Sequence, residues 1–198
     1  MPSPVYPALV ALVLVTACTA TTASAPMRLG ADGRPVAVVY RIAERDVPQI
    51  QARMRDAINT VRQQQGLAPV EFDVALTSAA ATQARDMSLQ GRPWHFGSDG
   101  SSPIDRVRRV GYTGHFLGET LSETYETELE TLTAWLTEAD TRAIILDPRA
   151  RQLGFAWHQD ANGKLWWVLT TGANDGTGLA VQQGQTQAPV AMTAPNRG

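Results

Sequence analysis

The spacing of apolar residues along the first half of the chain predicts long amphipathic helices. Between Asp46, a candidate N-cap, and Gly66, apolar side chains recur every three or four residues. This spacing places them on one face of a helix, with Pro48 in its first turn. The residues of that face are Ile50, Met54, Ile58 and Val61. We therefore predict a helix that begins at Asp46 and ends near Gly66.

The same pattern predicts three more helices. The second begins at Asp73, the third is short and opens at Ser102-Pro103, and the fourth covers about 126–139. A further helical turn is expected at 142–146. The predicted buried positions are Leu76, Ala80, Ala84 and Met87, then Ile104, Val107 and Val110, then Leu129, Leu132 and Leu136. The many alanines of the second helix indicate close approach to a neighbouring layer.

Strands are indicated where apolar and β-branched residues form short runs. The run 36–42 is a candidate edge strand. Residues 151–158 and 164–172 flank the sequence Asp-Ala-Asn-Gly, which is typical of a tight hairpin turn. The order of elements therefore predicts an α+β fold with helices on both sides of a small antiparallel sheet.

The N-terminal segment predicts export. Residues 8–17 form an apolar run that is too short to span a bilayer, and it ends in Val-Thr-Ala before Cys18. This ending resembles a bacterial lipobox, so we predict a signal peptide at 1–17 and lipidation of Cys18, the single cysteine. Residues 18–35 would then be a flexible tether. Cleavage after Ala25 and plain secretion is the alternative.

Both routes place the protein outside the cytoplasm. The lipoprotein route predicts a membrane anchor, in the outer membrane or periplasm if the cell is Gram-negative. At the other end of the chain, residues 175–198 are rich in Gly, Gln, Thr, Ala and Pro and are predicted to be a disordered tail.

Composition limits the class of protein. The chain has 198 residues, is 43% hydrophobic and carries a formal net charge of −2. These values fit one globular domain and give no reason to expect nucleic acid as a partner, because phosphate binding needs a concentrated basic surface. The densest basic group is Arg106, Arg108 and Arg109. We interpret it as the solvated surface of the third helix.

Several short motifs occur in a characteristic order. Trp-His-Phe at 94–96 is followed by Ser-Pro-Ile-Asp-Arg-Val-Arg-Arg-Val-Gly-Tyr at 102–112, Gly-Glu-Thr at 118–120 and a tryptophan-containing helix. Over residues 46–174 this order resembles the CAP superfamily of cysteine-rich secretory, antigen 5 and pathogenesis-related proteins, especially its bacterial SCP-like branch. The resemblance implies a three-layer α-β-α sandwich with a small antiparallel sheet, and we place this domain at 36–174.

The resemblance also implies a cavity of two histidines and two glutamates. By position, His95, Glu119 and Glu138 match three of these residues, and they are expected to converge in one cleft. Trp166 falls where the second histidine is expected. Other departures from the family pattern are Thr120, Leu169 and the pair Thr141-Arg142. Without the resemblance, the alternative is that His95 and Glu119 form a structural hydrogen-bonding pair.

The altered cavity favours binding over catalysis. An indole has no lone pair for a metal, so His95 and Glu119 are expected to hold at most a weak divalent ion, and no cofactor is expected. We therefore predict a tethered binding module for an apolar small molecule, an envelope polymer or a protein. The alternative is a metal-assisted hydrolase that uses His95, Glu119 and Glu138; no catalytic residue is identified beyond that alternative.

The other aromatic and histidine residues leave choices open. Four tryptophans are expected either in the core or along an apolar wall of the cleft: Trp94, Trp157, Trp166 and Trp167. His115 lies in a glycine-flanked loop, where exposure is favoured over a role as a replacement ligand. His158 is expected to be exposed, opposite Lys164 at the hairpin end.

Overall fold

The computed structural model describes residues 27–29, 35–37, 40–123 and 125–174, and the chain divides into two compact units between Val38 and Val39. In the first unit, β1 (Met27–Leu29) pairs with β2 (Pro35–Ala37) in an antiparallel arrangement. Thus β1 occurs inside the segment expected to be a tether. Cys18, the signal peptide 1–17 and the tail 175–198 lie outside the described residues.

The expected edge strand at 36–42 is replaced by a shorter element. Within that range, residues 36–37 belong to β2 and pair with β1, whereas residues 40–42 have no regular structure. Hydrogen bonds instead hold residues 40–42 to the segment 159–161 of the same unit. Ile42 N–H donates to Gln159 Oε1, Gln159 Nε2 donates to the Tyr40 carbonyl, and Arg41 donates to the carbonyls of Asp160 and Ala161.

The second unit contains all the predicted helices. They are α1 (Val47–Gln64), α2 (Val74–Gln90), α3 (Pro103–Arg109), α4 (Glu128–Thr137) and α5 (Ala139–Ile145), with a 3-10 turn, η1 (Glu44–Asp46), before α1. Asp73 caps α2 by accepting a hydrogen bond from the Leu76 amide, as the sequence favoured. Asp46 makes no such side-chain bond, because η1 continues directly into α1. No helix within the described ranges is both long and apolar enough to cross a bilayer.

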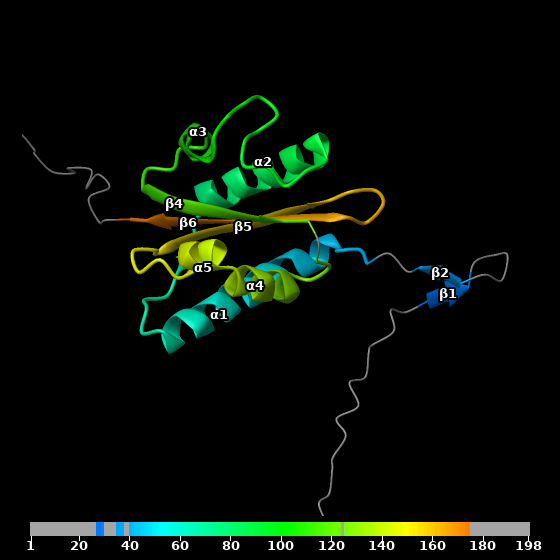
Figure 1. Ribbon diagram of the computed structural model, residues 1–198, viewed down its shortest axis with the longest axis horizontal. Helices are drawn as coiled ribbons and strands as arrows, with labels where there is room; N and C mark the ends of the chain where they lie inside the picture. The colour runs from blue at the N-terminus through cyan, green and yellow to red at the C-terminus, as the bar shows by residue number, and fades with distance from the viewer. Residues whose placement is uncertain (1–26, 30–34, 38–39, 124, 175–198) are drawn as a thin grey trace, which may run out of the picture. The chain divides into compact units, whose positions relative to one another are not determined.

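The sheet separates the helices into two layers. Its strand order is β3 (Glu71–Phe72), β5 (Gln152–Gln159), β6 (Leu165–Ala173) and β4 (His115–Ser122). Helices α2 and α3 cover one face, and α1, α4 and α5 cover the other (Figure 1). This arrangement confirms the α+β sandwich, although β3 pairs with β5 in parallel, so the sheet is mixed.

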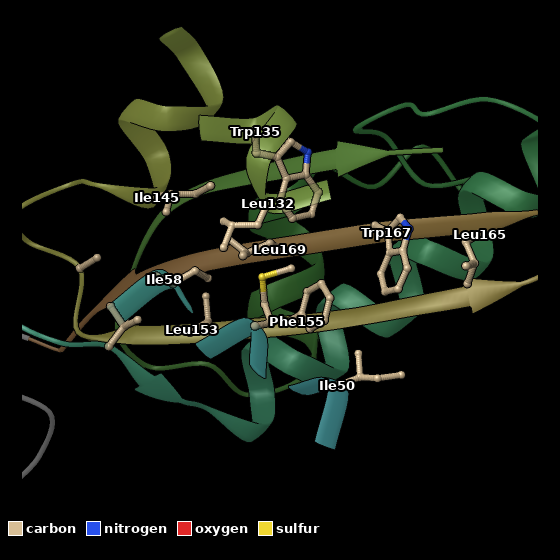
Figure 2. Close-up of a cluster of buried hydrophobic side chains, with 13 residues drawn as sticks. Ile50, Ile58, Leu132, Trp135, Ile145, Leu153, Phe155, Leu165, Trp167 and Leu169 are labelled. Atoms are coloured by element: carbon tan, nitrogen blue, oxygen red, sulfur yellow. The ribbon is translucent and has the colours of Figure 1, made fainter. Parts of the chain in front are cut away.

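Large side chains fill the layer between the sheet and α1, α4 and α5. Ile58, Leu132 and Trp135 converge there on the strands (Figure 2). Phe155 and Trp167 stack with ring centroids 5.7 Å apart and an interplanar angle of 4°. These buried rings supply much of the apolar burial that stabilises the fold.

The opposite layer is thinner. The predicted buried face of α2 is confirmed, since Leu76, Ala80, Ala84 and Met87 are 0% exposed. Small residues let this helix approach the sheet. A Cβ atom at Gly154 of β5 would lie 2.3 Å from the backbone carbon of Leu76. The close packing of α2 against the sheet fixes the position of the turn that follows this helix, and that turn carries the candidate site.

Two predicted core residues face outward. Ile104 is 47% exposed and Leu129 is 43% exposed, so these two predictions were wrong. In α3 the buried face contains Arg106 beside Val107, and in the first turn of α4 it contains Glu128. Apolar periodicity alone does not identify these two buried positions, because each is occupied by a charged residue that has partners.

Candidate functional site

His95 lies in the turn that links α2 to α3. Helix α2 ends at Gly91, whose positive φ of 66° forms a left-handed C-cap. The following turn is fastened to both helices. Gln83 Nε2 of α2 donates to the Trp94 carbonyl, and Arg106 Nη1 of α3 donates to the His95 carbonyl at 2.9 Å. The backbone around His95 is therefore held by polar side chains.

Glu119 enters the same site from β4, where it lies opposite Thr170 of β6. Its side chain is 3% exposed. The carboxylate Oε1 lies 2.9 Å from Nδ1 of His95, whose side chain is 52% exposed. The structure thus brings together the imidazole and the first carboxylate that the sequence singled out.

Arg106 completes the group and corrects the sequence analysis. Its side chain is 2% exposed, so the interpretation of this residue as solvated surface was wrong. Its Nη2 atom donates to both oxygens of Glu119, at 3.0 and 2.8 Å, and its Nη1 atom also donates to the Ser101 carbonyl at 3.2 Å. A buried carboxylate and a buried guanidinium therefore neutralise each other beside the Nδ1 edge of the His95 ring.

The local sequence explains how α3 presents Arg106. Ser102 and Asp105 form a capping box, and Pro103 occupies the first turn. These residues fix where α3 begins. Arg106 then shares a helical face with Val107 and Val110, the two apolar residues that point inward. Each of the three arginines in this run is adjacent to Val107 or Val110, so the sequence alone carried no signal that singles out Arg106.

The residues before and after His95 both carry exposed aromatic rings. Trp94 is 42% exposed and Phe96 is 44% exposed, and their ring centroids are 5.6 Å apart. The guanidinium of Arg92 lies over the Trp94 ring, 4.6 Å from its centroid. Of the four tryptophans considered, Trp94 is therefore the exposed one, whereas Trp166 and Trp167 are buried and Trp157 packs partly buried against the core.

Glu138 does not join the pair. It is exposed at the junction of α4 and α5, in the layer on the other side of the sheet from α3 (Figure 1). Within the described part of the chain, no hydrogen bond or ion pair connects its carboxylate to His95 or Glu119.

Trp166 also lies away from His95. It is buried under α2, where its Nε1 atom donates to Asp160 Oδ2 at 2.9 Å and the Lys164 ammonium lies 3.8 Å from its ring centroid. Glu119 pairs with Thr170, four residues farther along β6, which corresponds to about 13 Å of strand. Trp166 therefore anchors the hairpin end rather than contacting the His95–Glu119 pair.

The remaining family departures and histidines have local roles. Thr120 and Leu169 are buried neighbours across β4 and β6, and the Thr141 hydroxyl donates to the Trp135 carbonyl at 2.5 Å. His115 is exposed at the start of β4. His158 is partly buried and lies opposite Trp166, not Lys164, which corrects the predicted register.

The donor set does not fit a metal ion. Among the residues that the structure describes, no three His, Cys, Asp or Glu side chains are grouped closely enough to share one. His95 supplies one imidazole, and both oxygens of Glu119 already accept hydrogen bonds from a cation. A catalytic zinc needs about three protein ligands and an open position. The chemistry of these residues is instead that of an oriented imidazole beside exposed aromatic rings.

Comparisons with known proteins agree with this fold. The family model for the cysteine-rich secretory protein family (CAP) matches residues 55–170. The uncharacterized protein YkwD of Bacillus subtilis (strain 168) is 26% identical over 124 residues, which are 63% of this chain and 48% of YkwD. The chain thus spans about half the length of that relative.

Two solved structures have the same fold at low sequence identity. An outer surface protein of Borrelia burgdorferi superposes with a TM-score of 0.61 at 15% identity, covering 69% of this chain and 99% of that one. An extracellular SCP-domain protein of Bacillus anthracis str. Ames gives 0.59 at 16% identity, covering 72% and 47%. With the family model spanning more than half of its length, this chain belongs to the CAP family of cysteine-rich secretory proteins.

Proposed function

We propose that this protein is an extracytoplasmic, membrane-tethered binding module that attaches to a polymer of the cell envelope. The observation that carries the proposal is the surface formed by the consecutive residues Trp94, His95 and Phe96, which exposes two aromatic rings in contact with each other and a half-exposed imidazole. We call this the aromatic surface. It is the part of the site that faces solvent, and its polar base is buried.

The chemistry of this surface suits a sugar polymer. An aromatic ring is rigid and apolar, so a sugar ring that packs its C–H face on Trp94 or Phe96 releases water from both partners. The half-exposed imidazole of His95, the residue between them in sequence, offers a directional hydrogen bond. Exposed aromatic groups of this kind are typical of binding sites rather than of a monomer's inert surface.

The location is supported by family membership and by the N-terminal sequence. The two structural neighbours are described as an outer surface protein and as an extracellular protein. In this chain, the apolar run 8–17 and the lipobox-like ending at Cys18 motivate the tether. An acylated Cys18 would hold the domain at a membrane surface beside the envelope polymer.

Co-sedimentation with insoluble envelope polysaccharide tests the binding. The double variant Trp94→Ala/Phe96→Ala should weaken binding by about tenfold or more, since aromatic anchors carry much of the affinity at such surfaces. Leu129→Ala is the matched control, because Leu129 is equally exposed but belongs to α4 in the other layer. Equal binding by the native protein and the double variant would refute the proposal. If native mass spectrometry instead shows a co-purified apolar molecule, that molecule and not the polymer would be the ligand.

Fractionation of cells tests the tether separately. Cys18→Ser should move the protein from the membrane fraction to the soluble fraction, since its acyl chains would be lost. A native protein that is already soluble would support cleavage after Ala25 instead. A Cys18→Ser protein that stays fully membrane-bound would place the anchor elsewhere.

A further inference from the structure

The charge of Glu119 is already balanced inside the protein. Its carboxylate is 3% exposed, and the Arg106 side chain that donates to both of its oxygens is 2% exposed. The pair is shielded from solvent, so water and salt screen it little. A guanidinium therefore occupies the place beside this carboxylate where a bound cation would lie.

The same guanidinium also fixes the backbone of His95. Through Nη1 it donates to the carbonyls of His95 and Ser101. Arg106 thus controls both the main chain of His95 and, through Glu119, its ring. A metal ion bound by side chains alone would hold the ring but not the turn.

The arrangement determines which ring nitrogen carries the proton. An ionised carboxylate only accepts hydrogen bonds, so the contact of 2.9 Å between Glu119 Oε1 and His95 Nδ1 requires a proton on Nδ1. Because the Nδ1 edge of the ring faces the buried carboxylate, the exposed half of the side chain carries Nε2. In the neutral ring Nε2 has a free lone pair.

We propose that Arg106 takes the place of a metal ion beside Glu119 and, as a positioning residue, fixes His95 with Nε2 turned outward as a hydrogen-bond acceptor. The part of this inference that concerns the ligand rests on the function proposed above. An acceptor on the residue between Trp94 and Phe96, whose exposed rings contact each other, selects a ligand with a hydroxyl hydrogen and an apolar ring face. This is the chemistry of an uncharged sugar unit, and it needs no metal.

Nitrogen NMR of the imidazole rings reads the proton position directly. In the native protein at a pH where His95 is neutral, its two nitrogens should give widely separated signals, with Nδ1 protonated. In Arg106→Met the buried carboxyl loses its cation and takes up a proton, because burial disfavours an unpaired charge. It then donates to Nδ1, and the proton of the ring shifts to Nε2.

The matched control is Arg109→Met. Arg109 lies on the same helix, but its side chain is 59% exposed and pairs with exposed Asp99. This variant should keep the native signals of His95. An Arg106→Met protein that folds and still shows Nδ1 protonated would overturn the proposal, and so would a native protein in which Nε2 is protonated.

A second variant keeps the test decisive if Arg106→Met does not fold. Arg106→Met/Glu119→Gln removes both charges and leaves similar volumes. The amide of glutamine can donate as well as accept, so the strict preference for a proton on Nδ1 should be lost. Retention of that preference in the folded double variant would show that Arg106 and Glu119 do not set it.

Zinc alone is the probe for metal independence. Stoichiometric zinc should leave the His95 signals of the native protein unmoved, and zinc-dependent loss or shift of the Nε2 signal would overturn the proposal. These measurements need no ligand. Failure of polymer binding would therefore remove the proposed function and leave the tautomer result standing, whereas a failed tautomer test would remove this inference alone.

Discussion

Among the residues that the structure describes, two arginines are buried, one on each side of the sheet, and their contacts differ. Arg62 of α1 is 0% exposed and donates only to backbone carbonyls, those of Ala68, Ile145, Asp147 and Ala150. Arg106 of α3 is 2% exposed and donates to the carboxylate of Glu119 as well as to carbonyls. Arg62 donates through all three of its side-chain nitrogens, whereas the buried Nε atom of Arg106 has no hydrogen-bond partner in the described part of the chain. Of the two, only Arg106 is linked to a solvent-facing side chain.

The difference separates a structural role from a functional one. Arg62 ties the end of α1 to the end of α5 and to the loop that follows, so it closes the layer that contains α1 and α5. Burial and nearby Arg151 lower the pKa of Arg62, and Asp147 partly opposes this. No exposed group depends on Arg62 in the described contacts. Arg106, by contrast, donates to Glu119, and Glu119 is hydrogen-bonded to His95 of the aromatic surface.

Arg62→Met should have the largest effect on stability. The substitution leaves several buried carbonyls without a donor, each at a cost of about 1–3 kcal/mol, so we expect a loss of roughly 4 kcal/mol. Urea unfolding followed by tryptophan fluorescence measures the change. Arg55→Met on the same helix is the control, since Arg55 pairs at the surface with Asp56. A loss below about 1 kcal/mol would contradict the role given to Arg62.

Arg106→Met should cost slightly less and depend on Glu119. Alone it removes the cation from a buried carboxyl group, which must then take up a proton, and this costs about 3 kcal/mol. Adding Glu119→Gln removes that carboxyl group, so the double variant should recover about 1–2 kcal/mol of the loss. Denaturant unfolding of the two single variants and the double variant gives the coupling energy. Strict additivity of the two losses would show that the pair is not coupled.

The distinction between the two arginines was beyond the reach of the sequence. The helices, the hairpin and the three layers follow from apolar spacing and turn residues, and the structure confirms them. His95 and Glu119 stood out through motifs that the family shares. However, Arg106 lies in the run Arg-Val-Arg-Arg, where three cations look alike until the packing of α3 decides which one is buried.

For Glu138 and Trp166, position along the chain was not enough to place the side chain. Each was placed in the cavity by its position along the chain, but contact depends on the face of the sheet and on the register of its strands. Glu138 belongs to the layer of α4 and α5. Trp166 is fixed by its pairing with His158 and by Asp160. A one-residue change of register moves a side chain to the other face of the sheet, so position along the chain alone does not place it.

Low pH should destabilise the layer that contains α1 and α5, because Asp147 becomes protonated. Hydrogen bonds from Arg149 lower the pKa of Asp147, burial opposes them, and nearby Arg62 adds a smaller lowering. Because its pKa is lower in the folded state, Asp147 stabilises the fold at pH values above the ordinary pKa of Asp. This contribution is lost as the pH falls through the folded-state pKa. The advantage of the native protein over Asp147→Asn, about 1 kcal/mol or less near pH 6, should therefore shrink below about pH 4. Unfolding at a series of pH values measures it, and a constant advantage would contradict it.

Arg109→Met should have the smallest effect and sharpens the comparison within a single helix. Arg109 is three residues from Arg106, but its guanidinium reaches Asp99 at 2.8 Å from an exposed position. Exposed ion pairs of this kind contribute about 0–1 kcal/mol, because water solvates both charges when the pair separates. We expect a change within about 0.5 kcal/mol in urea unfolding and no change in polymer binding. A loss as large as that of Arg106→Met would mean that α3 depends on its total positive charge. The same outcome would show that burial does not distinguish the contribution of Arg106 to stability from that of Arg109.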